Sequence, residues 1–230
     1  MSAQDRLIQV QKNIQNACER SGRQPSEVEL VGVSKKKSAE EIRAFFELGL
    51  KSFGENYLQE ALPKLKEIPK SAMRLHFVGH LQSNKVKPVV ENFDVIHSVD
   101  RLKILKVIDR HAEEIKKVQE VLLQLNIGDE DSKSGFSAEE VIEQISELFS
   151  YKNVVIRGLM SFPPLGDEKQ TREYFRKTKM IFDRIRGALT DEQAKQFDSI
   201  SMGTTSDYGI AIEEGATMVR VGTALFGERS

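Results

Sequence analysis

The sequence predicts an α/β protein with the fold of a (β/α)8 barrel, and three observations support this prediction. From residue 28 onward, short β-branched runs alternate with longer helical segments, as in a chain of βα units. About eight such runs occur, which is the number of strands that closes this kind of barrel. No linker or shift in composition interrupts the alternation, so we expect one domain over residues 1–230. The predicted strands have the sequences VELVGVS, KSFGEN, RLHFVG, DVIHSV, EVLLQLN, VVIRGLM, DSISMG and MVRVG.

The helices predicted between these strands carry recognisable start signals. Ser38 with Glu41 and Ser137 with Glu140 both match the capping box, in which a hydroxyl and a carboxylate bind free amides of the first turn. The predicted ranges are 38–49, 56–69, 82–91, 100–118, 137–151, 167–189 and 205–215.

The sequence also predicts where two helices end, and it predicts an additional helix before the first strand. Gly49 and Gly215 stand where a left-handed residue would end a helix. Residues 2–21 form an amphipathic helix that Gly22 and Pro25 end, and within residues 1–24 we expect it to pack on the barrel. Its apolar residues, spaced by three and four, are Leu7, Val10, Ile14 and Ala17.

Composition excludes several classes of protein. With 34 Lys and Arg against 35 Asp and Glu, the net charge of -1 gives no general attraction to nucleic acid or to an anionic membrane. No run approaches the roughly 18 apolar residues of a membrane span, and the first residues lack the apolar core of a signal peptide. Cys18 is the only cysteine, so no intrachain disulfide can form, and we expect a cytoplasmic protein in which Cys18 fills a buried apolar position.

Polar residues gather at the predicted carboxyl ends of the strands. Active sites of such barrels lie at these ends, so we expect the residues to converge on one mouth that binds a small molecule. They are Lys35, Asn56, His80, His97, Asn126, Met160, Ser201, Gly203, Arg220, Gly222 and Thr223.

Lys35 has the most informative position of these residues. The two-residue period of a strand places it in one row with Val31 and Val33, so it extends a buried row. Because Lys36 and Lys37 follow, neighbouring positive charge favours the neutral amine, which can condense with an aldehyde. A solvated run of charges at the strand exit is the alternative, and Lys35 alone leaves it open.

The end of the chain offers a predicted phosphate site. The segments GTTSD (203–207) and VGTALFG (221–227) follow the last two strands, where barrels of this type commonly bind phosphate. Gly222 allows close approach of a ligand to the backbone, and Thr205 and Thr223 offer hydroxyl donors. Simple helix capping by these residues is the alternative.

Seven strings, taken together, resemble one known family. The chain is similar to the pyridoxal phosphate homeostasis proteins, which are single-domain relatives of the N-terminal barrel of alanine racemase. The similarity runs in order, without large gaps, from about residue 28 to the end. The strings are GVSK (32–35), FGENYLQE (53–60), HFVGHLQSNK (76–85), HSVDR (97–101), DSKSG (131–135), RGLMSF (157–162) and MVRVGTALFGER (218–229).

This resemblance implies a fold type III barrel, a monomer, and pyridoxal 5'-phosphate (PLP) as the cofactor. Lys35 would hold PLP as a Schiff base at the end of the first strand. Thr204 and Thr205 stand where the family usually has Met and Ser, so the hydroxyl at 205 is retained with an added methyl group. The other implied cofactor-binding residues are Asn56, Met160 and Ser201 around the ring and phosphate, Thr205, Gly222 and Thr223 at the phosphate, and Arg220 at the pyridine nitrogen.

We expect a carrier of PLP rather than a catalyst. Pyridoxal enzymes that use the ring as a strong electron sink place a carboxylate at the pyridine nitrogen, whereas Arg220 favours the unprotonated ring. Intracellular PLP homeostasis, with transient delivery to apo-enzymes, is therefore the leading hypothesis. A weak amino-acid racemase using Lys35 and a second group, such as Tyr57 or a histidine, is the alternative, and a Schiff-base aldolase for sugar phosphates is a third.

Three further sequence patterns have simpler explanations than a functional site. Lys36, Lys37 and Lys133 could transiently accept PLP as it leaves Lys35, although simple solvation is the more common role of loop lysines. The spacing of Asp129, Asp131 and Glu140 resembles a calcium loop, but Lys133 and Ser134 occupy positions that such a loop gives to a ligand and to glycine. No Cys or HExxH pattern accompanies His76 and His80, so we predict no metal site there.

Overall fold

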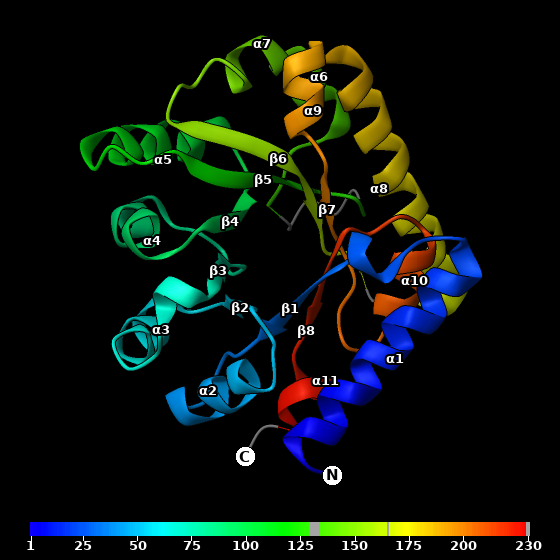
Figure 1. Cartoon of the computed structure of the whole chain (residues 1–230). Helices are drawn as coiled ribbons and strands as arrows, with labels where there is room; N and C mark the ends of the chain where they lie inside the picture. The colour runs from blue at the N-terminus through cyan, green and yellow to red at the C-terminus, as the bar shows by residue number, and fades with distance from the viewer. Residues whose placement is uncertain (129–133, 165, 229–230) are drawn as a thin grey trace.

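The structure of the protein, a computed structural model, describes residues 1–128, 134–164 and 166–228. Within these residues eight parallel strands close into a barrel in chain order, with β8 paired to β1 (Figure 1). The predicted (β/α)8 barrel is confirmed, and each predicted run forms one strand. The strands are β1 (Glu29–Val33), β2 (Ser52–Glu55), β3 (Arg74–Phe77), β4 (Val95–Val99), β5 (Gln119–Leu125), β6 (Val154–Ser161), β7 (Ser199–Ser201) and β8 (Met218–Val221).

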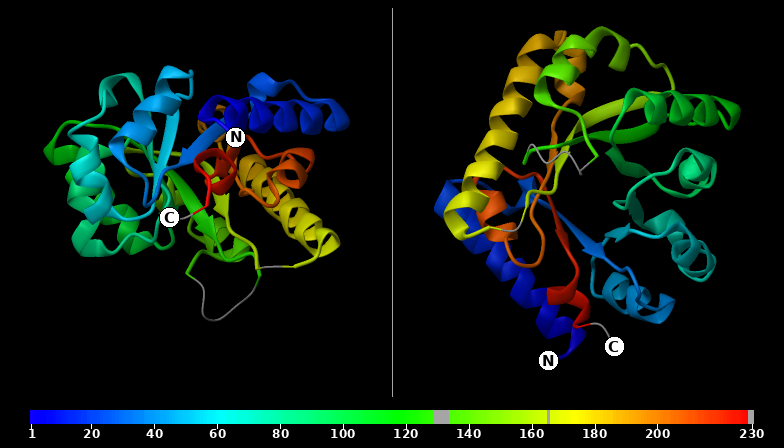
Figure 2. Two further views of the ribbon diagram at one scale, coloured as in Figure 1. Left: turned by 90° about the horizontal axis from the view of Figure 1, so that it is seen from below. Right: turned by 180° about the vertical axis from the view of Figure 1, so that it is seen from behind.

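Helices surround the strands on the outside of the barrel, as the views in Figure 2 show. Across the described ranges, no helix combines the length and the apolar character needed to cross a membrane. The α-helices are α1 (Ala3–Ser21), α2 (Ala39–Glu47), α3 (Leu58–Leu65), α4 (Val86–Asn92), α5 (Leu102–Glu114), α6 (Ala138–Glu143), α7 (Ile145–Leu148), α8 (Glu168–Ala188), α9 (Asp191–Gln196), α10 (Tyr208–Glu213) and α11 (Thr223–Phe226). The 3-10 helices are η1 (Pro25–Glu27), η2 (Lys70–Ala72) and η3 (Ser83–Lys85).

Two predicted helices are each divided in the structure. The helix expected over 82–91 begins as η3 and continues as α4, because Pro88 has no amide to bond across that junction. The helix expected over 137–151 is split into α6 and α7 at Gln144, whose ψ of 10° leaves the helical range.

Other helix boundaries differ by a few residues. The helix expected over 205–215 starts only at Tyr208, because the amide of Thr204 donates to the Asp207 carboxylate at 2.5 Å and closes a turn first. Helix α9 was not predicted, although Thr190 forms a capping box with Gln193 at its start.

The predicted capping boxes and glycine caps are confirmed, although α3 and α5 end four residues before their predicted ends. Both capping boxes, at Ser38 and at Ser137, are formed. Gly49 and Gly215 have φ values of 101° and 99°, in the left-handed region where a side chain would be strained.

Helix α1 packs against α10 and α11 with the apolar face that the sequence predicts. Cys18 is buried on this helix, and burial raises the pKa of its thiol, which suits an apolar packing role. The buried residues of the predicted face are Leu7, Val10, Ile14 and Ala17.

Candidate functional site

A cavity of about 510 Å³ lies at the carboxyl ends of β1, β2 and β8, and we call it the mouth cavity. Six of the eight residues predicted to bind the cofactor line it, so segments far apart in the sequence do converge here. Those six are Lys35, Asn56, Thr205, Arg220, Gly222 and Thr223. The other lining residues are Val33, Val78, Phe162, Thr204 and Ser206, of which Thr204 and Ser206 belong to the predicted phosphate segment 203–207. The sequence did not single out Val78 or Phe162 for the site.

The remaining two predicted residues are buried and are not among those that line the mouth cavity. Met160 is buried in a small cluster with Leu122 and Met218. Ser201 is fully buried and accepts a hydrogen bond from Arg220 at 2.6 Å. Their assignment as pocket-lining residues stays a prediction.

Lys35 lies two residues after the end of β1, beyond the buried row of Val31 and Val33, and is itself partly exposed at the mouth cavity. Lys36 follows with a φ of 61°, which turns the chain sharply after Lys35. The Lys36 amide donates to the Glu60 carboxylate of α3, so the turn is anchored to a neighbouring helix.

A second lysine, Lys64 of α3, lies buried next to the start of this turn. Its Nζ donates to the Glu55 carboxylate at 2.6 Å and to the Ser34 carbonyl at 3.0 Å. The Ser34 hydroxyl donates to the same carboxylate oxygen at 2.7 Å. The pKa of the Glu55 carboxyl is raised, because the effect of burial exceeds the opposing effect of the positive charge on Lys64. The cluster fixes the backbone just before Lys35. This cluster was not predicted from the sequence, although the spacing could have indicated it: Lys64 follows Ala61 by three residues and so lies on the buried face of α3.

The loop after β7 and the turn after β8 form a cup of amides and hydroxyls. Thr205 Oγ1 accepts from the amide of Gly222 at 3.2 Å and from the amide of Ala224 at 3.4 Å. Gly203 has a φ of 88°, and a Cβ there would lie 2.5 Å from the Cβ of Ala211. Glycine is therefore required for the loop to pack against α10.

Arg220 occupies the floor of the mouth cavity with its guanidinium buried. Besides its bond to Ser201, it donates to the Ser161 carbonyl at 3.0 Å. Burial lowers the pKa of Arg220 to about 10, while the Asp207 carboxylate acts in the opposite direction. Among the described residues no carboxylate lies within ion-pair distance, yet the side chain stays charged at neutral pH.

His97, which the sequence placed among the mouth residues, lies inside the barrel instead. It is the third residue of β4 and is fully buried, and its ring contacts His76 and Ser201. His80 lies near the mouth on an exposed loop and lines a neighbouring cavity of about 320 Å³ together with Asn126 and Phe162.

The other signals are resolved only in part. Lys133, Asp129 and Asp131 lie outside the described residues, while Glu140 caps α6 by accepting from the Ser137 amide at 2.7 Å. In the described ranges, no group of three or more His, Cys, Asp or Glu side chains is placed to hold a metal ion.

Comparison with known proteins agrees with this geometry. Residues 6–230 match the family model described as alanine racemase, N-terminal domain. The chain is 40% identical to the pyridoxal phosphate homeostasis protein of Pasteurella multocida, over 100% of this chain and 98% of that protein. The corresponding protein of Aquifex aeolicus is 41% identical, over 100% of this chain and 99% of the relative. The chain belongs to the pyridoxal phosphate homeostasis protein family.

Solved structures give the same result, and the family resemblance predicted from the sequence is confirmed. PipY of Synechococcus elongatus, in a structure with PLP bound, is 34% identical with a TM-score of 0.82, covering 98% of this chain and 100% of that one. An alanine racemase of Clostridium difficile has a TM-score of 0.74 at 18% identity, covering 97% of this chain and 57% of the racemase, which shows a shared fold.

Proposed function

We propose that this protein binds PLP in the mouth cavity, holds it as a Schiff base with Lys35, and serves intracellular PLP homeostasis by storing the cofactor and delivering it to apo-enzymes. The curated relatives carry that name, and a PipY structure holds PLP. We further propose a cytoplasmic monomer, from the single cysteine and from likeness to the family.

The residues present fit PLP. Two amides already converge on one oxygen, that of Thr205, which is the arrangement that a phosphate oxygen needs. Within the described chain, Asn56 Oδ1 is buried beside the cavity without a hydrogen-bond partner, so a ligand donor would satisfy it. Thr205, Gly222 and Thr223 would hold the phosphate, and Arg220 would face the pyridine nitrogen.

When bound, PLP supplies a reactive aldehyde carbon. The neutral Lys35 amine adds to this carbon, the carbonyl oxygen leaves as water, and the reverse hydrolysis frees the cofactor again. The phosphate cup keeps the aldehyde within reach of Lys35 during both steps.

The observation that favours a carrier over a catalyst is the composition of the mouth cavity. Among its described lining residues, only Lys35 and Arg220 are titratable. Racemisation needs a second acid or base on the other face of the ring, and Arg220 does not supply one because it remains protonated. Tyr57, considered as that group, follows Asn56 but is exposed and is not among the lining residues.

The test is the near-visible spectrum of the purified protein, followed by borohydride reduction and peptide mass mapping. We expect a yellow protein with the pyridoxyl adduct on Lys35, no visible band in Lys35→Ala, and no measurable amino-acid racemase rate. A racemase rate that Lys35→Ala abolishes would favour the enzyme hypothesis. A protein that stays colourless after PLP is added would contradict PLP binding and favour the aldolase.

Lys36 and Lys37 are the described members of the proposed delivery route. Lys36 is exposed, and Lys37 is partly buried with its Nζ 3.4 Å from the Glu41 carboxylate. We expect the triple variant of Lys36, Lys37 and Lys133 to alanine to transfer PLP to an apo-enzyme more slowly. Transfer at the wild-type rate would exclude the route.

A further inference from the structure

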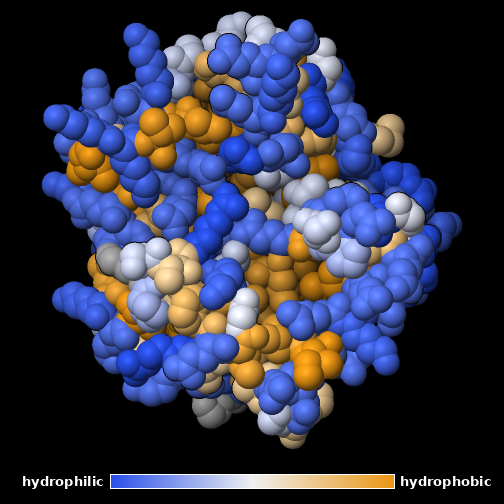
Figure 3. Space-filling view, in the orientation of Figure 1, coloured by the Kyte–Doolittle hydropathy of each residue, from blue (hydrophilic) through white to orange (hydrophobic). Residues whose placement is uncertain are grey.

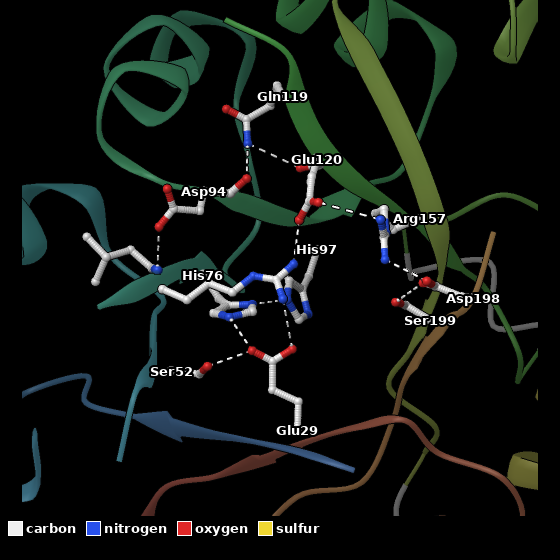
Figure 4. A network of polar contacts seen from close by, with 12 residues as sticks. Glu29, Ser52, His76, Asp94, His97, Gln119, Glu120, Arg157, Asp198 and Ser199 are labelled. Carbon is white, nitrogen blue, oxygen red and sulfur yellow. Dashed lines mark hydrogen bonds and ion pairs between the residues drawn. The ribbon is translucent and has the colours of Figure 1, made fainter. Parts of the chain in front are cut away.

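A continuous chain of polar side chains crosses the interior of the barrel, from the mouth cavity to the opposite end. Arg220 donates to Ser201 at 2.6 Å, and Ser201 Oγ lies 3.0 Å from Nδ1 of His97. Nε2 of His97 lies 2.9 Å from Nδ1 of His76, whose Nε2 lies 3.2 Å from Glu29 (Figure 4). We call these five residues the relay. Ser201, His76 and His97 are fully buried, so water does not compete for these contacts.

Glu29, at the start of β1, is the foot of the relay and the one member near solvent at the amino end. It accepts from the Ser52 hydroxyl at 2.6 Å and pairs with Arg74 at 3.4 Å. Glu29 and Ser52 also line a second cavity, of about 490 Å³, between α1 and the starts of β1 and β2. Figure 3 shows a mostly hydrophilic face with an apolar hollow near its centre, beside α1. The relay therefore joins two cavities at opposite ends of the barrel.

The two ends of the relay determine the direction of its hydrogen bonds. Arg220 can only donate, and an ionised Glu29 can only accept. With both histidines neutral, Ser201 donates to His97 Nδ1, His97 donates from Nε2 to His76, and the remaining proton, on His76 Nε2, faces Glu29. This last contact, at 3.2 Å, does not have the geometry of a regular hydrogen bond, and Nε2 of His76 has no hydrogen-bond partner among the described residues.

Charge balance and burial favour this neutral arrangement. The relay and the ion network at its foot contain three guanidinium groups and three carboxylates, so neutral histidines leave no net charge. Burial holds the pKa of His97 well below its usual value, and the positive charge of Arg220 acts in the same direction. The six charged groups are Arg74, Arg157 and Arg220, with Glu29, Glu120 and Asp198.

We propose that Glu29, His76 and His97 are positioning residues that act through Ser201 to orient Arg220, so that the charge state at the amino end of the barrel sets how Arg220 meets the pyridine ring of PLP. This inference rests on the proposed function. A proton added to Nδ1 of His76 reverses the two histidine bonds, because that nitrogen must then donate to His97. Ser201 would accept from both His97 and Arg220, and its own proton would turn elsewhere.

The experiment compares two glutamates that lose the same charge. Glu29→Gln removes the anion at the foot of the relay, whereas Glu120→Gln removes the anion that pairs with Arg74 and Arg157 outside the relay. The readout is the pH titration of the visible band of bound PLP. We expect Glu29→Gln to move the midpoint by about half a pH unit or more, and Glu120→Gln to leave it in place. Equal midpoints in wild type and Glu29→Gln, or equal shifts in the two variants, would overturn the proposal.

A second comparison cuts the relay in the middle. His97→Leu leaves Ser201 without its acceptor, and we expect PLP to bind about tenfold more weakly with a shifted titration. His97→Gln keeps one donor and one acceptor and should restore most of both. If His97→Leu does not fold, the comparison of Glu29→Gln with Glu120→Gln still decides. A wild-type protein without a visible band would instead contradict the proposed function itself.

Discussion

Arginines lie at both ends of the barrel, but their burial and their partners differ: Arg74 and Arg157 are partly exposed, whereas Arg220 is buried. At the amino end, Arg74 pairs with Glu29 and Glu120, and Arg157 pairs with Glu120 and with Asp198 at 2.6 Å. At the mouth, the acceptors that Arg220 has among the described residues are neutral oxygens, those of the Ser201 side chain and the Ser161 carbonyl.

This difference indicates what each end is for. A charge that is paired with an opposite charge stabilises the folded state, and its partner largely cancels its attraction for a ligand. When a buried cation is hydrogen-bonded to neutral groups alone, no opposite charge cancels its electrostatic attraction for an incoming anion or ring nitrogen. This contrast supports the proposal that the mouth is the binding end, which is where barrels of this type have their active sites.

Lys64→Met is expected to have the largest effect. The Lys64–Glu55 pair lies near the mouth, yet we expect it to stabilise the fold, so this variant tests whether burial or position in the barrel decides the role of a charge pair. Both side chains are at most 10% exposed, so removing the lysine leaves the Glu55 carboxylate buried without its cation, although the Ser34 hydroxyl still donates to it. We expect a loss of about 3–5 kcal/mol in the free energy of unfolding, measured by urea denaturation. Arg157→Met at the amino end, whose partner Asp198 is 42% exposed, should cost about 1 kcal/mol or less. Similar losses in both variants would contradict the role of burial, and adding Glu55→Gln to Lys64→Met should recover much of the loss.

Acid unfolding sharpens the comparison, because Glu29 and Glu55 have opposite pKa shifts. The pKa of Glu29 is lowered from 4.5 to about 2, since contacts with His76 and Ser52 and the charge of Arg74 together outweigh burial. Its contribution is present above pH 4.5 and is lost as the pH falls toward 2, at most about 3 kcal/mol. The raised pKa of Glu55 has the opposite sign, so its contribution is lost as the pH rises above 4.5.

Glutamine variants separate the two carboxylates. Stability measured by urea denaturation between pH 2 and 7 should depend less steeply on pH below 4.5 in Glu29→Gln than in wild type. Glu55→Gln should retain that acid slope. The same slope in wild type and in Glu29→Gln would show that other carboxylates dominate acid unfolding.

A smaller effect is expected at the phosphate cup. Thr205→Val keeps the shape of the side chain but removes the oxygen that accepts from the amides of Gly222 and Ala224. We expect PLP to dissociate about tenfold faster, followed as decay of the visible band after dilution. Thr205→Ser retains the hydroxyl and should stay within about twofold of wild type. Faster loss from Thr205→Ser as well would assign the added methyl group, not the hydroxyl, to PLP binding.

The sequence predicted the barrel and most of the mouth because both depend on local patterns. A two-residue period placed Lys35 at the end of β1, and the glycine and threonine motifs located the phosphate cup. The relay was not predicted, since it joins His76, His97 and Glu29 across three strands. From the sequence we placed His97 at the mouth, considered His76 only as a metal ligand and did not single out Glu29. Only closure of the barrel brings their polar atoms close together.

The smallest predicted effect concerns the turn that carries Lys35. Lys36 has a φ of 61°, a conformation that costs a residue with a side chain more than it costs glycine. Lys36→Gly should therefore raise the free energy of unfolding by about 0.5 kcal/mol. Lys37→Gly, at an ordinary φ, should lower it by about 0.5–1 kcal/mol and also loses the contact with Glu41. Urea denaturation of the two variants beside wild type is the measurement. Equal destabilisation by both glycines would show that the turn relaxes freely, in which case Lys35 would not be held in place by strained backbone.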